Sequence, residues 1–329
     1  MKTILSVVLT LAAFAAKAEN VIKVDGSSTV FPVTEAVAEE FQASTKGQIK
    51  VTVGVSGTGG GFKKFCRGET DVQDASRPIT KEEMATCKAA KVNYIELPIA
   101  FDAIAIVVSK KNTWANEITV EELKKMWEPA AQGKITTWKQ VNPKWPDEKL
   151  ELFGSTTDNG TFDYFTEAIV EKAKASRGDY TASVDPNTRV TGVSTTKGAL
   201  GYLPFAYYIS NKDKLKILKV IGGAKAPSKD GILPSEQTVI SGTYFPLSRP
   251  IFIYLNQDSL KRAEVKKFAD YYLDHAGEMA KQVQYIALPQ KSYDITKQHL
   301  NKGRLGTVFG GEAQVGLTID QILKKEATF

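Results

Sequence analysis

Three stretches of the chain share one layout: a short apolar or β-branched run, a loop of glycine and hydroxyl residues, and then a helical pattern. The loops cover residues 25–29, 56–61 and 155–161, and the runs before them cover 21–24, 49–55 and 150–153. Strands that alternate with helices in this way predict an α/β protein with mostly parallel strands. Loops that follow parallel strands face a common crevice, so we expect these three to converge on one small ligand.

The composition of the loops indicates an anion site. The first turn of a helix leaves backbone N–H groups without partners, and the helix dipole places partial positive charge there. Glycine lets the backbone approach a ligand closely, while Ser and Thr add O–H donors. Each loop alone fits ordinary capping and turn formation better than it fits ligand binding. Three such loops together favour a binding site for a small oxyanion.

A fourth junction, at 74–78, adds a charged residue. Thr80 to Glu83 reads as a capping box that opens the next helix. Arg77, just before it, could hold two oxygens of an anion with its forked guanidinium. The alternative is a surface arginine that pairs with Asp71 or Asp74.

No pattern typical of an enzyme is present. The chain has two histidines, His275 and His299, which we expect on exposed helix surfaces, and it contains neither HExxH nor GxSxG. The loop 56–61 lacks the GK[ST] ending of a nucleotide-binding loop. We therefore predict no catalytic residue, no metal ligand and no cofactor. Basic and acidic residues are interleaved, as in 261–267, which argues against nucleic-acid binding.

The N-terminus reads as a secretory signal peptide, residues 1–18, with an apolar run at 4–16 and cleavage after Ala18. Without its two lysines the formal charge falls from +6 to +4. No later apolar run is long enough to span a bilayer, so we expect a periplasmic protein. In that compartment Cys66 and Cys87 predict one disulfide, which would stabilise the fold by roughly 3 kcal/mol. The alternative is a reactive thiol or a metal pair.

Segments along nearly the whole mature chain resemble the periplasmic phosphate-binding proteins of ABC transporters. These segments are VDGSSTVFPVTEAVAEEF at 24–41, VSGTGGGFKKF at 55–65, DASRPI at 74–79, DNGTFDYF at 158–165, GALGYLPFAYY at 198–208 and SRPIFIYL at 248–255. The resemblance implies a type II-like fold of two α/β lobes that close on the anion. It also implies a monomer that binds inorganic phosphate and delivers it to a membrane permease.

The resemblance also implies where the chain passes between the lobes. We expect two crossing strands, near 99–107 and 249–255, to form the hinge of the cleft. Lobe I would then consist of 19–100 plus 252–329, and lobe II of 101–251.

Matched residue by residue, the resemblance implies phosphate contacts in all three loops, at Ser28, Thr29, Thr58, Asn159, Gly160 and Thr161. Many relatives have Ser at the position of Asn159. Some relatives also carry an arginine before the third loop, where this chain has none. Arg77 is our first candidate for the missing charge, and Arg177 is the second.

Selectivity for phosphate needs a hydrogen-bond acceptor, because phosphate keeps a proton at neutral pH and sulfate does not. Part of the family has Asp at the position of Ser76, so the acceptor must be sought elsewhere. Asp102 is the leading candidate, since it interrupts an apolar run. Asp74 is the second, and Asp158, which could also cap the third helix, is the third. The alternative for Asp102 is a structural ion pair with Arg77 or another base.

Two other functions remain open. One is a binding protein for another tetrahedral oxyanion, such as sulfate or molybdate. The other, more distant, is a secreted phosphatase.

Overall fold

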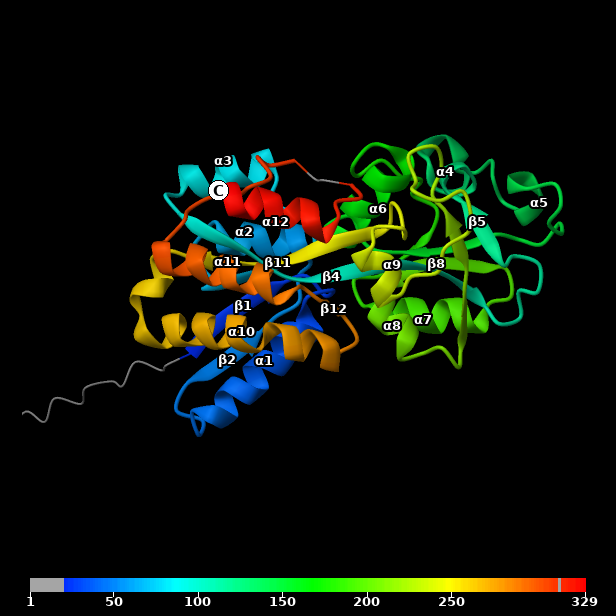
Figure 1. Cartoon of the computed structure of the whole chain (residues 1–329). Helices are drawn as coiled ribbons and strands as arrows, with labels where there is room; N and C mark the ends of the chain where they lie inside the picture. The colour runs from blue at the N-terminus through cyan, green and yellow to red at the C-terminus, as the bar shows by residue number, and fades with distance from the viewer. Residues whose placement is uncertain (1–20, 313–314) are drawn as a thin grey trace, which may run out of the picture.

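The computed structural model describes residues 21–312 and 315–329, and the signal peptide predicted at 1–18 lies outside this range. Figure 1 shows two α/β lobes side by side, joined by the long strands β4 (Tyr94–Ser109) and β11 (Ser248–Asn256). The two-lobed architecture agrees with the prediction. Within the described ranges, no helix is long and apolar enough to cross a membrane.

The first lobe is built on a sheet with strand order β2-β1-β3-β11-β4. Strand β1 (Val21–Gly26) pairs in parallel with β2 (Lys50–Val53) and β3 (Val72–Ala75), as the repeated strand–loop–helix layout predicts. A further short strand, β12 (Ile286–Ala287), pairs with β4. The helices of this lobe are α1 (Phe31–Ser44), α2 (Thr58–Phe65), α3 (Lys81–Ala89), α10 (Ala263–Gln282), α11 (Gln290–Lys302) and α12 (Ile319–Thr328), with a 3-10 turn at Ser259–Lys261.

The second lobe continues the same sheet through β8 (Ala199–Pro204), β6 (Glu151–Gly154) and β7 (Thr181–Ala182). Strand β6 is parallel to both β8 and β7. Three more strands complete the lobe: β9 (Leu215–Ile217) pairs with β4, and β5 (Glu117–Thr119) pairs with β10 (Lys219–Ile221). Its helices are α4 (Val120–Trp127), α5 (Trp138–Val141), α6 (Gly160–Val170), α7 (Pro186–Thr195), α8 (Phe205–Ile209) and α9 (Glu236–Ile240), with a 3-10 turn at Pro129–Ala131.

Strand β4 belongs to both lobes. Residues 94–103 pair with β11, and residues 104–108 pair with β8. All sixteen residues of β4 are buried. The expected crossings near 99–107 and 249–255 fall within β4 and β11, and the expected lobe boundaries after residues 100 and 251 fall within the same two strands.

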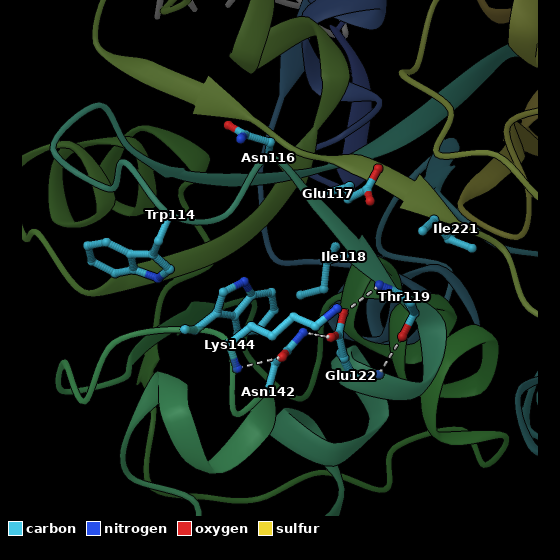
Figure 2. A pocket seen from close by; sticks show the side chains of 10 residues that line it. Trp114, Asn116, Glu117, Ile118, Thr119, Glu122, Asn142, Lys144 and Ile221 are labelled. Atoms are coloured by element: carbon cyan, nitrogen blue, oxygen red, sulfur yellow. Dashed lines mark hydrogen bonds between the residues drawn. The ribbon is translucent and has the colours of Figure 1, made fainter.

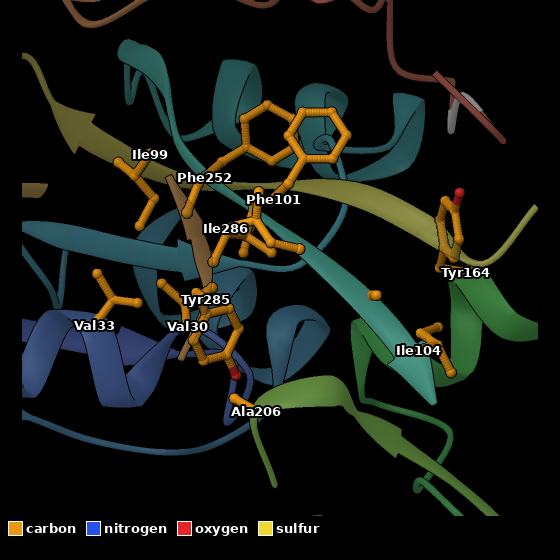
Figure 3. Close-up of a cluster of buried hydrophobic side chains, with 14 of the residues drawn as sticks. Val30, Val33, Ile99, Phe101, Ile104, Tyr164, Ala206, Phe252, Tyr285 and Ile286 are labelled. Carbon is orange, nitrogen blue, oxygen red and sulfur yellow. The ribbon is translucent and has the colours of Figure 1, made fainter. Parts of the chain in front are cut away.

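A large buried apolar cluster runs through the strands and the helices that cover them. Figure 3 shows part of it, where Phe101 of β4 and Phe252 of β11 are drawn with Val33 of α1 and Ile286 of β12. All four are at most 4% exposed. Full burial of each such side chain contributes roughly 1.5–3 kcal/mol, so the shared strands are held by packing as well as by hydrogen bonds.

The predicted disulfide is confirmed. Cys66, at the end of α2, is bonded to Cys87 of α3. The predicted capping box is also present, since Thr80 accepts from the Glu83 amide and Glu83 accepts from the Thr80 amide. The capping box fixes the start of α3 close to the loop that carries Arg77, and the disulfide ties the last turn of α3 to the end of α2.

Candidate ligand-binding site

Loops from the two lobes meet where β1 and β6 end. Thr29, just after β1, places its Oγ1 3.0 Å from Oγ1 of Thr161, at the start of α6. Asn159 donates from Nδ2 to Ser28 Oγ at 3.2 Å. All four side chains are at most 4% exposed. The first and third loops of the sequence analysis therefore converge, and they are in contact.

The second loop reaches the same place. Thr58 Oγ1 lies 3.2 Å from Ser76 Oγ and accepts from the Ser76 amide at 3.2 Å. A Cβ atom added at Gly160 would lie 2.5 Å from Thr58 Oγ1 and 2.6 Å from Ser76 Oγ. Gly160 is therefore needed because the lobes approach each other too closely here for any side chain.

Arg249 is the cation of this cluster. It stands on β11, is 1% exposed, and donates from Nη1 to the Gly160 carbonyl at 2.9 Å and from Nη2 to Thr161 Oγ1 at 2.7 Å. Its Nη2 also reaches Thr29 Oγ1 at 3.4 Å. One guanidinium therefore touches loops from both lobes. The sequence pattern predicts Arg249 only as part of a crossing strand and does not indicate it as a site residue.

Asp102 faces Arg249 across the paired strands β4 and β11. Its Oδ2 accepts from Arg249 Nε at 3.3 Å and from Nη2 at 3.1 Å, so the alternative foreseen for Asp102, an ion pair with a base, is present. Burial raises the pKa of the carboxyl to about 6, although the charge of Arg249 opposes the shift. Among the described residues, Asp102 Oδ1 has no hydrogen-bond partner. A free acceptor therefore lies beside a cluster of hydroxyl donors.

A comparison with protein families identifies the fold. Residues 13–275 match the PBP superfamily domain. The chain belongs to the PBP superfamily. It is 48% identical to Protein SphX of Synechococcus elongatus over 305 residues, which cover 93% of this chain and 88% of the relative. It is 39% identical to phosphate-binding protein PstS of Staphylococcus saprophyticus over 288 residues, covering 87% and 86% of the two chains.

A solved structure gives the same result. This PBP superfamily chain is similar to a protein from Clostridium perfringens assigned as a phosphate ABC transporter substrate-binding protein and solved with bound phosphate. The TM-score is 0.67 and the sequence identity 26%, over 82% of this chain and all of the other. PBP superfamily members of this kind are substrate-binding proteins for transport.

Arg77, the first candidate for the cationic residue, forms ion pairs outside the cluster of donor loops. It is 2% exposed, and it donates from Nε to Asp163 at 2.7 Å and from Nη1 and Nη2 to Glu83 at 2.8 Å. Its partners are therefore not Asp71 or Asp74, the pairing that the sequence suggested. Asp163 lies on α6, so this buried ion pair joins the two lobes beside the donor loops.

Arg177, the second candidate, is bound within the second lobe. It pairs with Asp179 and donates to the carbonyls of Met126 and Ile135. None of these contacts involves a donor loop.

The other acceptor candidates also have defined places. Asp74 is buried in the first lobe, where it accepts from Thr34 Oγ1 at 3.0 Å, and burial raises its pKa well above the ordinary value. Asp158 is exposed, and its proposed capping role is wrong: the cap of α6 is Asn159, which accepts from the Thr161 amide at 2.8 Å. An aspartate and an asparagine in adjacent positions are equally good caps, so the sequence could not separate them.

Two further local predictions need correction. Helix α2 begins at Thr58 and not near Phe62, so Gly59 to Gly61 form its first turn. His299 is not on an exposed surface, because it is 6% exposed and lies 3.0 Å from Glu326. His275 is partly exposed and stacks on Tyr271.

One hollow in the described part of the chain, with a volume of about 600 Å³, lies away from the donor loops, at the far end of the second lobe between Trp114, Thr119 and Lys144 (Figure 2). At the donor loops the two lobes are in direct contact, through the Thr29–Thr161 and Asn159–Ser28 pairs. The arrangement is that of a closed cleft, with donors, one cation and one acceptor gathered inside it.

Proposed function

We propose that this PBP superfamily protein captures inorganic phosphate in the cleft between its lobes and delivers it to the permease of an ABC transporter. The observation that carries the proposal is the buried Arg249–Asp102 pair among hydroxyl donors from both lobes, with one carboxylate oxygen left free. A tetrahedral anion that keeps one proton matches this set, because it needs several donors and a single acceptor.

In this proposal the donors come from every loop and from both lobes. The proposed ligand residues are Ser28, Thr29, Thr58, Ser76, Asn159, Gly160, Thr161, Arg249 and Asp102. Arg249 takes the charge role for which Arg77 was the first candidate. Arg77 instead holds the lobes together through Asp163.

Asp102 would provide the discrimination against sulfate. Its free Oδ1 can accept a hydrogen bond from protonated phosphate. Sulfate carries no proton at neutral pH, so its oxygens would meet only the negative charge of the carboxylate. Burial strengthens that repulsion, because the low dielectric screens it poorly.

Further support comes from the relatives, since the 39% identical PstS is a phosphate-binding protein and the Clostridium structure contains phosphate. We further propose that the protein is exported by the segment 1–18, acts in the periplasm as a monomer, and carries out no covalent chemistry. The lobes would comprise 19–100 plus 252–329 and 101–251, with the hinge in β4 and β11.

Calorimetric titration of the mature, ligand-stripped protein tests the function directly. We expect tight phosphate binding and weak or absent sulfate binding. Tight sulfate or molybdate binding without a response to phosphate would assign the site to another oxyanion. Hydrolysis of a phosphomonoester by the pure protein would replace the receptor by a phosphatase.

A further inference from the structure

The second lobe contains a buried arginine, Arg189, that forms no ion pair with any residue in the described part of the chain. Arg189 is the fourth residue of α7 and is 1% exposed. Its Nη1 donates to the Tyr202 carbonyl at 2.8 Å, while its Nε and Nη2 have no hydrogen-bond partner within residues 21–312 and 315–329. Arg77, Arg177 and Arg249, the other arginines at most 5% exposed, each contact a carboxylate.

Such a residue is costly for the fold. A buried charge needs a partner, and each unpaired donor loses its hydration without a replacement. Burial lowers the pKa of Arg189 to about 10, so the guanidinium is still charged at neutral pH. A position that breaks a packing rule without a local gain is more often explained by function than by stability.

The topology places Arg189 at the cleft. Strands β6 and β8 run parallel, and the third donor loop follows the carboxyl end of β6. Strand β7 pairs with the last two residues of β6, and α7 starts four residues after it. Helix α7 therefore begins at the cleft edge of the second lobe and runs away from it, with Arg189 in its first turns.

The surroundings of Arg189 connect it to the proposed site. The charged and titratable groups that act on it are Tyr202, Tyr207, Asp185 and Arg249. Tyr207 Oη lies 3.5 Å from the Ser28 carbonyl, in the first donor loop. Asp185 is exposed and is bound to the Asn187 amide at the start of α7, so it does not neutralise Arg189 by contact.

A second unpartnered group lies in the same region. Tyr285 Oη is buried without a hydrogen-bond partner among the described residues, and burial and the charge of Asp102 raise its pKa well above the ordinary value, against the opposing charges of Arg249 and Arg189. Figure 3 shows the Tyr285 hydroxyl directed toward Ala206 of α8. Helix α8 also carries Tyr207, whose hydroxyl reaches the first donor loop at the Ser28 carbonyl.

The Arg249–Asp102 pair has no net charge when both side chains are ionised. Attraction of an anion to the cleft therefore needs a positive charge from another residue, and Arg189 can provide it. We propose that Arg189 supplies the uncompensated positive charge of the anion site and so favours doubly charged over singly charged forms of the ligand. This inference rests on the proposed phosphate function. It adds to that function a residue that does not touch the ligand but determines which charge state of the ligand is preferred.

The test compares Arg189→Met, which has a similar length and no charge, with Arg189→Lys, which keeps the charge. For Arg189→Met we expect phosphate affinity to fall roughly tenfold or more, given the Coulomb energy of a unit charge within the protein. The unfolding midpoint of the ligand-free variant should stay the same or rise, because an unpaired buried charge is removed. Arg189→Lys should keep most of the affinity.

A pH profile of phosphate affinity separates charge from packing. Wild-type affinity should increase as phosphate loses its second proton, and Arg189→Met should show a smaller increase. Arg177→Met is the matched control: that arginine is equally buried but has Asp179 and two carbonyls as partners, so its loss should lower stability and leave affinity unchanged.

Two results would overturn the inference. One is an Arg189→Met variant that binds phosphate like the wild type across the pH range. The other is a variant that loses stability and affinity together while Arg189→Lys does not restore binding. If the wild type itself fails to bind phosphate, the proposed function is wrong, and the titration of the unmodified protein shows this before any variant is made.

Discussion

At the scale of single residues, Asp102 links the chemistry of the site to pH. Its pKa of about 6 means that the carboxyl is ionised above that pH and protonated below it. Once protonated, it no longer repels sulfate and can donate to it. We expect the preference for phosphate over sulfate to shrink as the pH falls through 6, measured by sulfate competition on either side of that value.

Asp102→Asn provides the control for this pH effect. The amide has a similar size and no charge, so the variant should bind sulfate better than the wild type and show no change in selectivity around pH 6. Unchanged selectivity in the variant would move the acceptor role to Asp74 or Asp158. The raised pKa of Asp102 also makes the free energy of unfolding of the ligand-free protein depend on pH. The stabilising contribution of this carboxyl is fully present below its ordinary pKa of 3.8 and is lost as the pH rises through about 6.

Arg249→Lys tests the cation. The ammonium keeps the charge but cannot reach Asp102, the Gly160 carbonyl and Thr161 at once, as the guanidinium does. Each lost charge-assisted bond is worth about 1.5–3 kcal/mol, so phosphate affinity should fall at least tenfold by titration. Wild-type affinity in this variant would rule out Arg249 as a direct ligand.

Gly160→Ala tests the contact between the lobes. Its methyl group would meet Thr58 and Ser76 from the opposite lobe, and the cleft could no longer close fully. We expect a large loss of phosphate affinity with little change in the unfolding midpoint. Gly178→Ala is the control, because a Cβ there meets only Gln132 Oε1, at 3.4 Å, and binding should not change.

Asp102 and Arg249 show what sequence could reveal of the site. Asp102 is recognisable in the sequence because a lone acid inside an apolar run needs a partner or a function. Arg249 is a lone base inside the run 248–255, so the same signal could have identified it. Arg77 is the candidate that the sequence favours because it is the cation of the fourth strand-to-helix junction, at 74–78, and its guanidinium could hold two oxygens of an anion. Nothing in the sequence indicated that Glu83 and Asp163 would occupy its guanidinium, since that depends on how closely the lobes meet.

At the scale of secondary-structure elements, the disulfide ties α2 to α3. Replacement of both Cys66 and Cys87 by Ser should lower the free energy of unfolding by roughly 3 kcal/mol, measured with urea. Thr80→Ala, which removes the cap of α3, should cost only about 1 kcal/mol and serves for comparison. Equal losses in the two variants would mean that the disulfide contributes no more than a helix cap.

The elements themselves were largely predictable. The repeated strand–loop–helix layout gave the parallel strands β1, β2 and β6, and the capping box gave the start of α3. The start of α2 was placed late, because three successive glycines read as a loop. In the structure they form the first helical turn, in which the Gly61 amide donates to the Gly57 carbonyl and the Gly59 amide donates to the Asp158 carbonyl of the opposite lobe.

At the scale of the whole molecule, the Arg77–Asp163 pair joins the lobes next to the site. Asp163→Asn should favour the open form of the ligand-free protein, while Glu83 still compensates the charge of Arg77. Small-angle scattering should then show a larger radius of gyration, and phosphate affinity should fall because closure must be driven by the ligand.

Asp158→Asn is the control for that experiment. Asp158 faces Lys63 at 3.8 Å, and both side chains are exposed. Exposed pairs contribute about 0–1 kcal/mol, so the variant should keep the wild-type radius and affinity. A scattering profile of Asp163→Asn that matches this control would mean that the buried pair does not govern closure.

The placement of β11 between β3 and β4 has a consequence for biosynthesis. The sheet of the first lobe lacks the strand that connects β3 to β4 until residue 256 has left the ribosome, although β1, β2 and β3 are made within the first 75 residues. The second lobe can assemble earlier, on the later part of β4. The proposed first lobe is encoded by two separated pieces of the gene, 19–100 and 252–329, so products truncated before residue 252 should leave this lobe poorly folded and open to proteases.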